Sequence, residues 1–206
     1  MTAKIFYKNM LEQEEQKKIK NILENDGVIA FVTDTVWGIG CLPESEKAVK
    51  RIYDIKHRDT KKPLILMSFD IYPLIKYVDT LPKSAQKLIK QYFPGALTLV
   101  LNKSIETPDY ITSSMPTVGI RVPDNEVFSE ICKLTDTKVL ATTSANLSSQ
   151  PAALTYEQAV EYIGESVDYV VKDYGLTAQG QASTVLGVFD DEIKIFRQGN
   201  VIINSL

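Results

Sequence analysis

The chain has 206 residues, 44% of them hydrophobic and 24% charged, and it carries a formal net charge of −3 at pH 7. This length allows one well-buried α/β domain or at most two small ones. The negative net charge excludes a protein that coats nucleic acid through an overall basic surface. Any site for a polyanion must therefore be a local cluster of Lys and Arg. Cys41 and Cys132 lie far apart and the chain has one histidine, which excludes the common Cys/His zinc patterns.

The N-terminal stretch MTAKIFYKNMLEQEEQ has no apolar segment of the kind found in secretory signals, and no apolar run in the chain reaches membrane length. Two isolated cysteines suit a reducing compartment. We therefore expect a cytoplasmic protein that makes no membrane contact.

The spacing of apolar residues predicts helices and strands in alternation. Residues 11–25 are expected to form a helix with Ile19, Ile22 and Leu23 on one face. Residues 28–32 form a continuous apolar run, which is typical of a strand covered on both faces. After a polar loop, the pattern predicts helices at residues 44–56, 71–77, 83–92, 125–134 and 156–163, and strands at residues 64–69, 97–101, 117–122, 139–143, 169–172, 183–188 and 193–196.

This order of elements predicts an α/β fold. The strand-rich C-terminal third argues against a purely parallel sheet, so we expect a twisted, mixed parallel and antiparallel sheet with flanking helices. The sequence contains no repeat, low-complexity segment or Pro/Ser-rich linker. We therefore expect a single domain over residues 1–206.

Familiar nucleotide and hydrolase motifs are missing. The sequence has no G-x-x-x-x-G-K-[ST] and no G-x-S-x-G, and Gly38–Gly40 lacks the third glycine of a dinucleotide fingerprint. Ser84–Lys87 has the form S-x-x-K without its partner motifs. A Ser-His-Asp triad would depend on His57, which lies in a charged segment. A nucleotide site in this chain must use other side chains.

A polar loop, Thr33-Asp34-Thr35, follows the first predicted strand and precedes Trp37, the chain's only tryptophan. Thr and Asp side chains often bond their own backbone, so each residue alone could serve a turn or a helix cap. Three such residues in a row favour a ligand site, because ligands of open α/β sheets bind at the ends of strands.

Cations and hydroxyls gather in three further segments. Residues 56–63, KHRDTKKP, are either a solvated charge run at a helix C-terminus or a phosphate clamp. Arg121 lies inside an apolar strand and needs an anionic partner, which is either a structural carboxylate or a substrate carboxylate. Residues 141–148, ATTSANLS, carry more hydroxyls than helix capping requires. Ser183, Thr184 and Arg197 repeat this composition more weakly. Together these segments favour phosphate and carboxylate binding, with catalysis by positioning and charge neutralisation.

These residues also form the motifs of a known family. The chain resembles the threonylcarbamoyl-AMP synthases, whose domain is called YrdC-like. Seven family motifs occur in order over roughly residues 20 to 200: TDTVWGIG at 33–40, KHR with KPL at 56–58 and 62–64, PGALT at 94–98, TVGIRVP at 117–123, SANLS at 144–148, STV at 183–185 and RQG at 197–199.

The resemblance implies a nucleotidyltransferase reaction, in which L-threonine, bicarbonate or CO₂ and ATP give L-threonylcarbamoyl-AMP and pyrophosphate. It implies Mg²⁺ as the companion of ATP, with no protein-ligated metal. It further implies that the product passes to a transferase complex that makes threonylcarbamoyladenosine in tRNA, and it raises the expectation of contact with tRNA or double-stranded RNA.

Matched motif by motif, the resemblance also implies the roles of individual residues. The side chains expected to bind ATP are Lys56, Arg58, Lys62, Thr117, Ser144, Asn146 and Arg197. Those expected to bind L-threonine are Thr33, Thr35, Arg121, Thr142 and Ser183. The residues expected to wall the pocket are Trp37 and Met67.

The chain departs from the family pattern at several positions. Val32 replaces a proline, Trp37 replaces a tyrosine, Gln198 replaces a proline, and Met67 stands where some members have a histidine near their threonine site. The two changes at the pocket wall bear on the amino-acid subsite more than on the ATP subsite. The length of the chain resembles the short, single-domain form of the family.

Two alternatives remain open at this stage. One is a different carbamoyl-adenylate enzyme, because similar domains serve in carbamoyl transfer during hydrogenase maturation. The other is an RNA-binding module without catalysis, which would bind through a basic surface and weaken steeply with salt.

Overall fold

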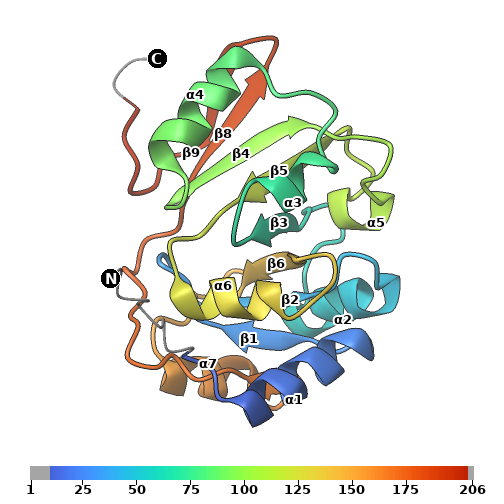
Figure 1. Ribbon diagram of the computed structural model, residues 1–206, viewed down its shortest axis with the longest axis vertical. Coiled ribbons are helices and arrows are strands. Elements are labelled where there is room, and N and C mark those ends of the chain that lie inside the picture. The colour runs from blue at the N-terminus through green and yellow to red at the C-terminus, as the bar shows by residue number, and fades with distance from the viewer. Residues whose placement is uncertain (1–9, 204–206) are drawn as a thin grey trace, which may run out of the picture.

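The sheet is the element that positions everything else. The computed structural model describes residues 10–203, and in this range nine strands join in the order β7-β1-β2-β6-β3-β5-β4-β8-β9. Figure 1 shows them along the long axis, with β1 near one end and β8 and β9 at the other. The strands are β1 Ile29–Phe31, β2 Gly38–Cys41, β3 Ile65–Ser68, β4 Leu97–Asn102, β5 Thr117–Arg121, β6 Val139–Ser144, β7 Tyr169–Val170, β8 Thr184–Phe189 and β9 Glu192–Arg197.

The strand pairs are of both kinds. β1 with β7, β3 with β5, and β4 with β8 are parallel, and the other neighbours are antiparallel. The predicted mixed sheet with flanking helices is therefore confirmed. The N-terminal stretch up to residue 9 lies outside the described residues, so the expectation about a signal segment is not tested there. No helix within residues 10–203 is long and apolar enough to cross a membrane.

Helices connect the strands and begin at side-chain caps in three cases. Ser45, Asn125 and Thr155 each accept a hydrogen bond from a backbone N–H in the first turn of the helix that follows. The helices are α1 Gln13–Glu24, α2 Glu46–Lys56, α3 Tyr72–Ile75, α4 Lys83–Tyr92, α5 Asp109–Thr112, α6 Glu126–Lys133 and α7 Tyr156–Ile163. In Figure 1 α3 and α6 lie in front of the sheet.

One face of the sheet is aliphatic. The register aligns one residue from each of five adjacent strands, and all five are fully buried: Leu186, Leu99, Ile120, Leu66 and Ala141. Side chains of aligned residues project to the same side of a sheet. This face is therefore the main packing surface of the core.

The opposite face is sparsely covered. The next aligned row contains Val100, Gly119, Ile65, Thr142 and Gly40, and it projects to the other side. Its two glycines carry no side chain. A Cβ added at Gly119 would approach Cγ2 of Ile65 to 2.8 Å, so the space there is already filled by the neighbouring strand. Small and polar residues on this face leave room for a cavity.

Two elements were missed in the sequence analysis. The sequence predicts a loop after the first strand, but Gly38–Cys41 forms β2, which pairs with β1 as a hairpin. Its two glycines have low strand propensity and concealed it. The four-residue helix α5 is too short to show a helical period.

We expect Gly119→Ala to lower the free energy of unfolding by about 1–3 kcal/mol, because the added methyl group overpacks against Ile65. Urea denaturation measures the loss. Ile65→Ala removes the contacted Cγ2 atom and serves as the matched background. If Gly119→Ala lowers the free energy of unfolding as much in the Ile65→Ala protein as in the wild type, the clash with Ile65 is not the cause.

Candidate active site

Thr33 and Thr35, in the connection between β1 and β2, form hydrogen bonds within that connection. The Thr33 hydroxyl donates to the carbonyl oxygen of Val36 at 2.6 Å, and the Thr35 backbone N–H donates to the Thr33 oxygen at 3.2 Å. The two hydroxyl oxygens lie 3.1 Å apart. Thr33 thus has the turn role that the sequence analysis weighed, while it also shapes the site.

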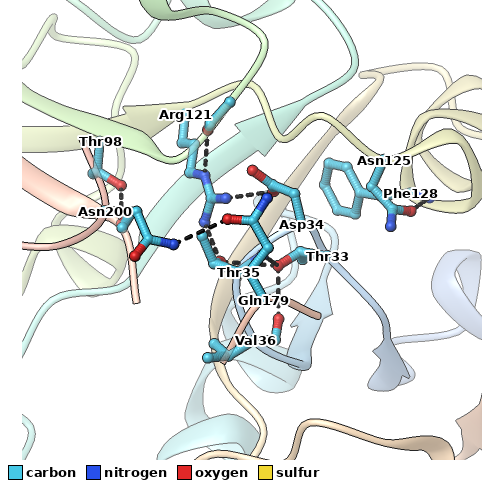
Figure 2. Close-up of polar contacts among 12 residues, drawn as sticks. Thr33, Asp34, Thr35, Val36, Thr98, Arg121, Asn125, Phe128, Gln179 and Asn200 are labelled. Atoms are coloured by element: carbon cyan, nitrogen blue, oxygen red, sulfur yellow. Dashed lines mark hydrogen bonds and ion pairs between the residues drawn. The ribbon is translucent and has the colours of Figure 1, made fainter. Parts of the chain in front are cut away.

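The guanidinium of Arg121 organises this loop, as Figure 2 shows. Its Nη2 donates to Asp34 Oδ1 at 2.5 Å, its Nη1 to Thr35 Oγ1 at 2.8 Å, and its Nε to the carbonyl oxygen of Gly95 at 2.9 Å. These bonds use three of its five N–H groups. Two N–H groups remain for a further acceptor.

The Arg121–Asp34 pair is buried, with side chains 3% and 8% exposed. Burial lowers the pKa of Arg121, and the Asp34 carboxylate counters that effect. The sequence analysis left open a structural or a substrate carboxylate as the partner of Arg121. Asp34 is the structural partner, and the two spare N–H groups leave room for a second carboxylate.

A second polar cluster lies where β4, β8 and β9 meet. The hydroxyl oxygens of Thr98 and Ser183 lie 2.8 Å apart. Arg197 donates from Nε to the Ser183 carbonyl oxygen at 3.0 Å and from Nη2 to the Ser183 hydroxyl at 3.2 Å. Arg197 therefore fixes Ser183. Burial lowers the pKa of Arg197 from its ordinary value.

The loop after β6 forms the third cluster. The Ser144 hydroxyl donates to Asn146 Oδ1 at 2.6 Å, and Asn146 Nδ2 donates to the carbonyl oxygen of Gln150 at 2.5 Å. Arg58 approaches from the segment after α2, where it donates to the carbonyl oxygens of Lys62 and Pro63, both at 3.1 Å. Burial lowers the pKa of Arg58.

These clusters border one cavity of about 380 Å³. Its lining includes eleven of the residues proposed from the sequence: Thr33, Thr35, Trp37, Arg58, Met67, Arg121, Thr142, Ser144, Asn146, Ser183 and Arg197. Three arginines and many hydroxyls line it, and no Asp or Glu does. Segments from residue 33 to residue 197 thus converge on one positively charged hollow.

Three of the proposed residues do not line the cavity. Lys62 is exposed to solvent next to Pro63, which does line it. Thr117 lies at the start of β5, on the same face as Arg121 but at the other end of the strand.

Lys56, the third of these residues, is directed into the protein and away from the cavity lining. Its side chain is 1% exposed, and its ammonium donates to Ser144 O, Asn146 O and Asn146 Oδ1 at 2.5, 2.6 and 2.7 Å. All three N–H groups are therefore used within the protein.

Trp37 forms a wall of the cavity and is fully buried. Its ring meets Tyr156 edge-on, with centroids 6.0 Å apart and an interplanar angle of 62°. Its indole N–H has no hydrogen-bond partner within residues 10–203. Met67 lines the same cavity, directly opposite Arg121 in the β3–β5 register.

Three contacts at the site were not expected from the sequence: the pairing of Asp34 with Arg121, the contact of Thr98 with Ser183, and the part that Gln150 plays. Asp34 could have been found, because a buried arginine requires a nearby anion and Asp34 lies within the first polar motif. Thr98 ends the PGALT motif, but nothing local indicates that it meets Ser183. Gln150 lines the cavity and takes part through its backbone carbonyl, which no side-chain pattern reveals.

Comparisons with known proteins agree with this geometry. A family model named Sua5/YciO/YrdC, with the description "Telomere recombination", matches residues 21–199. The threonylcarbamoyl-AMP synthase of Klebsiella pneumoniae is 33% identical over 93% of this chain and 99% of its own. The threonylcarbamoyl-AMP synthase of Pyrococcus abyssi is 31% identical over 96% of this chain, which spans 58% of that longer protein.

One of the similar solved structures contains a bound ligand. The crystal structure of P. abyssi Sua5 complexed with L-threonine superposes with a TM-score of 0.86 at 29% identity. It covers 92% of this chain, which corresponds to 55% of the P. abyssi chain.

We expect Asp34→Asn to lower the free energy of unfolding by about 3–5 kcal/mol, because it leaves the buried Arg121 guanidinium without an anion. Urea denaturation followed by the fluorescence of Trp37 measures the change. Glu46→Gln is the control: it removes the charge from an exposed pair with Lys50, whose atoms lie 2.7 Å apart, and should cost less than about 1 kcal/mol. Equal losses in the two variants would contradict the buried-pair account.

Proposed function

This chain belongs to the Sua5/YciO/YrdC family, and we propose that it is a threonylcarbamoyl-AMP synthase, as its relatives are named. Such an enzyme condenses L-threonine, bicarbonate or CO₂ and ATP to L-threonylcarbamoyl-AMP and pyrophosphate. The observation that carries the proposal is the lining of the cavity, where three arginines and many hydroxyls meet without a carboxylate. This donor set suits a substrate with phosphate and carboxylate groups.

L-Threonine is proposed to bind beside Arg121. The two N–H groups that Arg121 does not use within the protein would take the threonine carboxylate. The hydroxyls of Thr35, Thr142 and Ser183 line the same cavity and supply further hydrogen bonds. Met67 faces this subsite from β3 and would contact the threonine side chain.

ATP is proposed to bind toward Arg58 and Arg197. Both guanidinium groups line the cavity, and the Ser144–Asn146 loop provides a hydroxyl and an amide between them and the sheet. The exposed Lys62 lies next to the cavity wall and can swing toward a phosphate. Thr117 lies on the same sheet face, outside the cavity, and would be reached by a ligand that extends along β5.

The proposed chemistry depends on position and charge. The amine of bound threonine captures CO₂ as a carbamate, whose oxygen attacks the α-phosphorus of ATP in line, and pyrophosphate leaves. The chain supplies fixed cations that neutralise the growing negative charge, in a site where hydroxyl and guanidinium donors are already held in place. The rigid attachment of Arg121 to Asp34 orients the amino acid for this attack.

Mg²⁺ enters the proposal as the complex with ATP. Within residues 10–203 no group of three His, Cys, Asp or Glu side chains is placed to hold a metal. The cavity offers hydroxyl and guanidinium donors, which would bind phosphate oxygens, so the magnesium ion would be held by the phosphates and its own water. When bound, this ion would withdraw charge from the phosphate oxygens.

The product carries an activated carbamoyl group, so a transferase that uses it on tRNA is the proposed downstream partner. We place the reaction in the cytoplasm because its product is used on tRNA, and contact of this chain with tRNA or double-stranded RNA belongs to the same proposal. An RNA-binding module without catalysis would show RNA affinity that falls steeply with salt and no dependence on threonine.

Pyrophosphate release by the purified protein tests the function directly. With ATP, Mg²⁺, L-threonine and bicarbonate present, we expect release that stops when any one of the four is omitted. Replacing threonine by serine or valine tests the amino-acid specificity of the pocket, which Trp37 and Met67 line. Release that ignores threonine would contradict the synthase, and RNA binding without release would favour the RNA-binding module.

Two variants should separate the subsites. Arg58→Ala removes a cation from the ATP side and should raise the KM for ATP about tenfold or more, with little change for threonine. Arg121→Lys keeps the charge beside Asp34 but loses the planar fork, so it should raise the KM for threonine by roughly 10- to 100-fold. Each variant is the control for the other, and equal effects on both substrates would refute the assignment.

A further inference from the structure

Lys56 is the last residue of α2 and points into the protein. Its ammonium group has three N–H donors, and three oxygen atoms of the loop after β6 accept them. Two acceptors belong to Asn146 and one to Ser144. The donors and acceptors are matched in number, so the ammonium has no N–H group left for a ligand.

The same loop is attached to the Lys56 backbone. The Ser148 N–H donates to the carbonyl oxygen of Lys56 at 2.9 Å. On its other side the loop is held by the N–H of Ala145, which donates to the Trp37 carbonyl oxygen at 2.8 Å. Lys56 therefore holds residues 144–148 by hydrogen bonds of both its side chain and its main chain.

The side chain of Lys56 also sets the orientation of the Asn146 amide. Asn146 Oδ1 accepts from both Lys56 Nζ and the Ser144 hydroxyl, while its Nδ2 donates to Gln150. Without the ammonium, Asn146 Oδ1 and the carbonyl oxygens of Ser144 and Asn146 would lose their charged donor, and Ser144 O would keep only the Asn146 N–H at 3.1 Å. The positions of the Ser144 hydroxyl and of the Asn146 side chain, which both line the cavity, depend on this arrangement.

No carboxylate balances the ammonium. None of the ion pairs found within residues 10–203 includes Lys56. Residues 144–150 contain no titratable side chain, α2 itself contributes Tyr53 one turn earlier, and the segment after α2 contributes Arg58. Burial lowers the pKa of Lys56 to about 7, and the positive charge of Arg58 adds to this effect.

We propose that Lys56 is a positioning residue of the ATP subsite: its protonated side chain holds residues 144–148 in the conformation that presents Ser144 and Asn146 to the nucleotide. The inference rests on the proposed function, because it takes these two residues to bind ATP. It replaces the direct phosphate contact that the sequence motif implied. A neutral amine has two N–H groups for three oxygen atoms, so one of the three hydrogen bonds to residues 144–146 is lost when Lys56 loses its proton.

Lys56→Met tests the kinetic consequence, because methionine has a similar length and no donor. We expect the KM for ATP to rise about tenfold or more, while the KM for threonine stays within about twofold. Lys50→Met on the same helix is the control, since Lys50 is exposed and pairs only with Glu46 at the surface. Unchanged ATP dependence, or an equal loss for both substrates, would overturn the proposal.

Amide hydrogen exchange tests the same inference without activity. At pH 6 the wild-type N–H groups of Asn146 and Ser148 should be protected and those of Lys56→Met should not. If that variant does not fold, the wild-type protein decides alone: after correction for intrinsic exchange, protection of these two groups should fall as pH rises from about 6 to about 9. Protection that stays flat over this range would contradict the proposal.

The two hypotheses can fail separately. If the wild-type protein releases no pyrophosphate in a threonine-dependent manner, the proposed function is wrong, whatever the loop does. If it does so while loop protection is independent of both pH and Lys56, only the positioning role is wrong.

Discussion

A buried guanidinium that must be paired is the constraint on which the site depends. Arg121 ends a strand on the sparsely covered face of the sheet, where its side chain is buried and an unpaired charge would be costly. Asp34 neutralises it, and Thr35 and the Gly95 carbonyl complete its hydrogen bonds. These bonds hold the β1–β2 connection against Arg121 and leave two of its N–H groups unused. The pairing that stabilises the buried charge thus also prepares the place where we propose that a carboxylate binds.

In the remaining polar clusters, too, a cation forms hydrogen bonds to a residue or loop that lines the cavity. Arg197 fixes Ser183, and Lys56 fixes the loop that carries Ser144 and Asn146. Arg197 gives two of its N–H groups to protein oxygens and Lys56 gives all three of its own, so the donors that face the cavity lose little freedom when a ligand binds. Catalysis by positioning needs this kind of rigidity, because the transfer of a nucleotidyl group requires in-line alignment more than it requires a special side chain.

The sequence predicted most of the sheet, the helices longer than four residues and the general location of the site, because apolar periods and strand ends are local signals. It did not reveal β2, since Gly38 and Gly40 have low strand propensity. A Cβ added at either position would lie 3.0–3.1 Å from the Phe31 ring, a packing constraint that no local pattern shows. The contacts of Lys56 could not be predicted from the sequence either. A lysine beside an arginine predicts phosphate binding, and only the distance to Ser144 and Asn146 shows that its donors are already used.

We propose that the spare N–H groups of Arg121 bind the carboxylate of L-threonine. Calorimetric titration of the wild-type protein with L-threonine and with L-threoninamide, which lacks the carboxylate charge, tests it most directly. The account predicts that threoninamide binds roughly 10- to 100-fold more weakly, since a charge-assisted pair is replaced by a neutral contact. Equal affinity for the two ligands would contradict it.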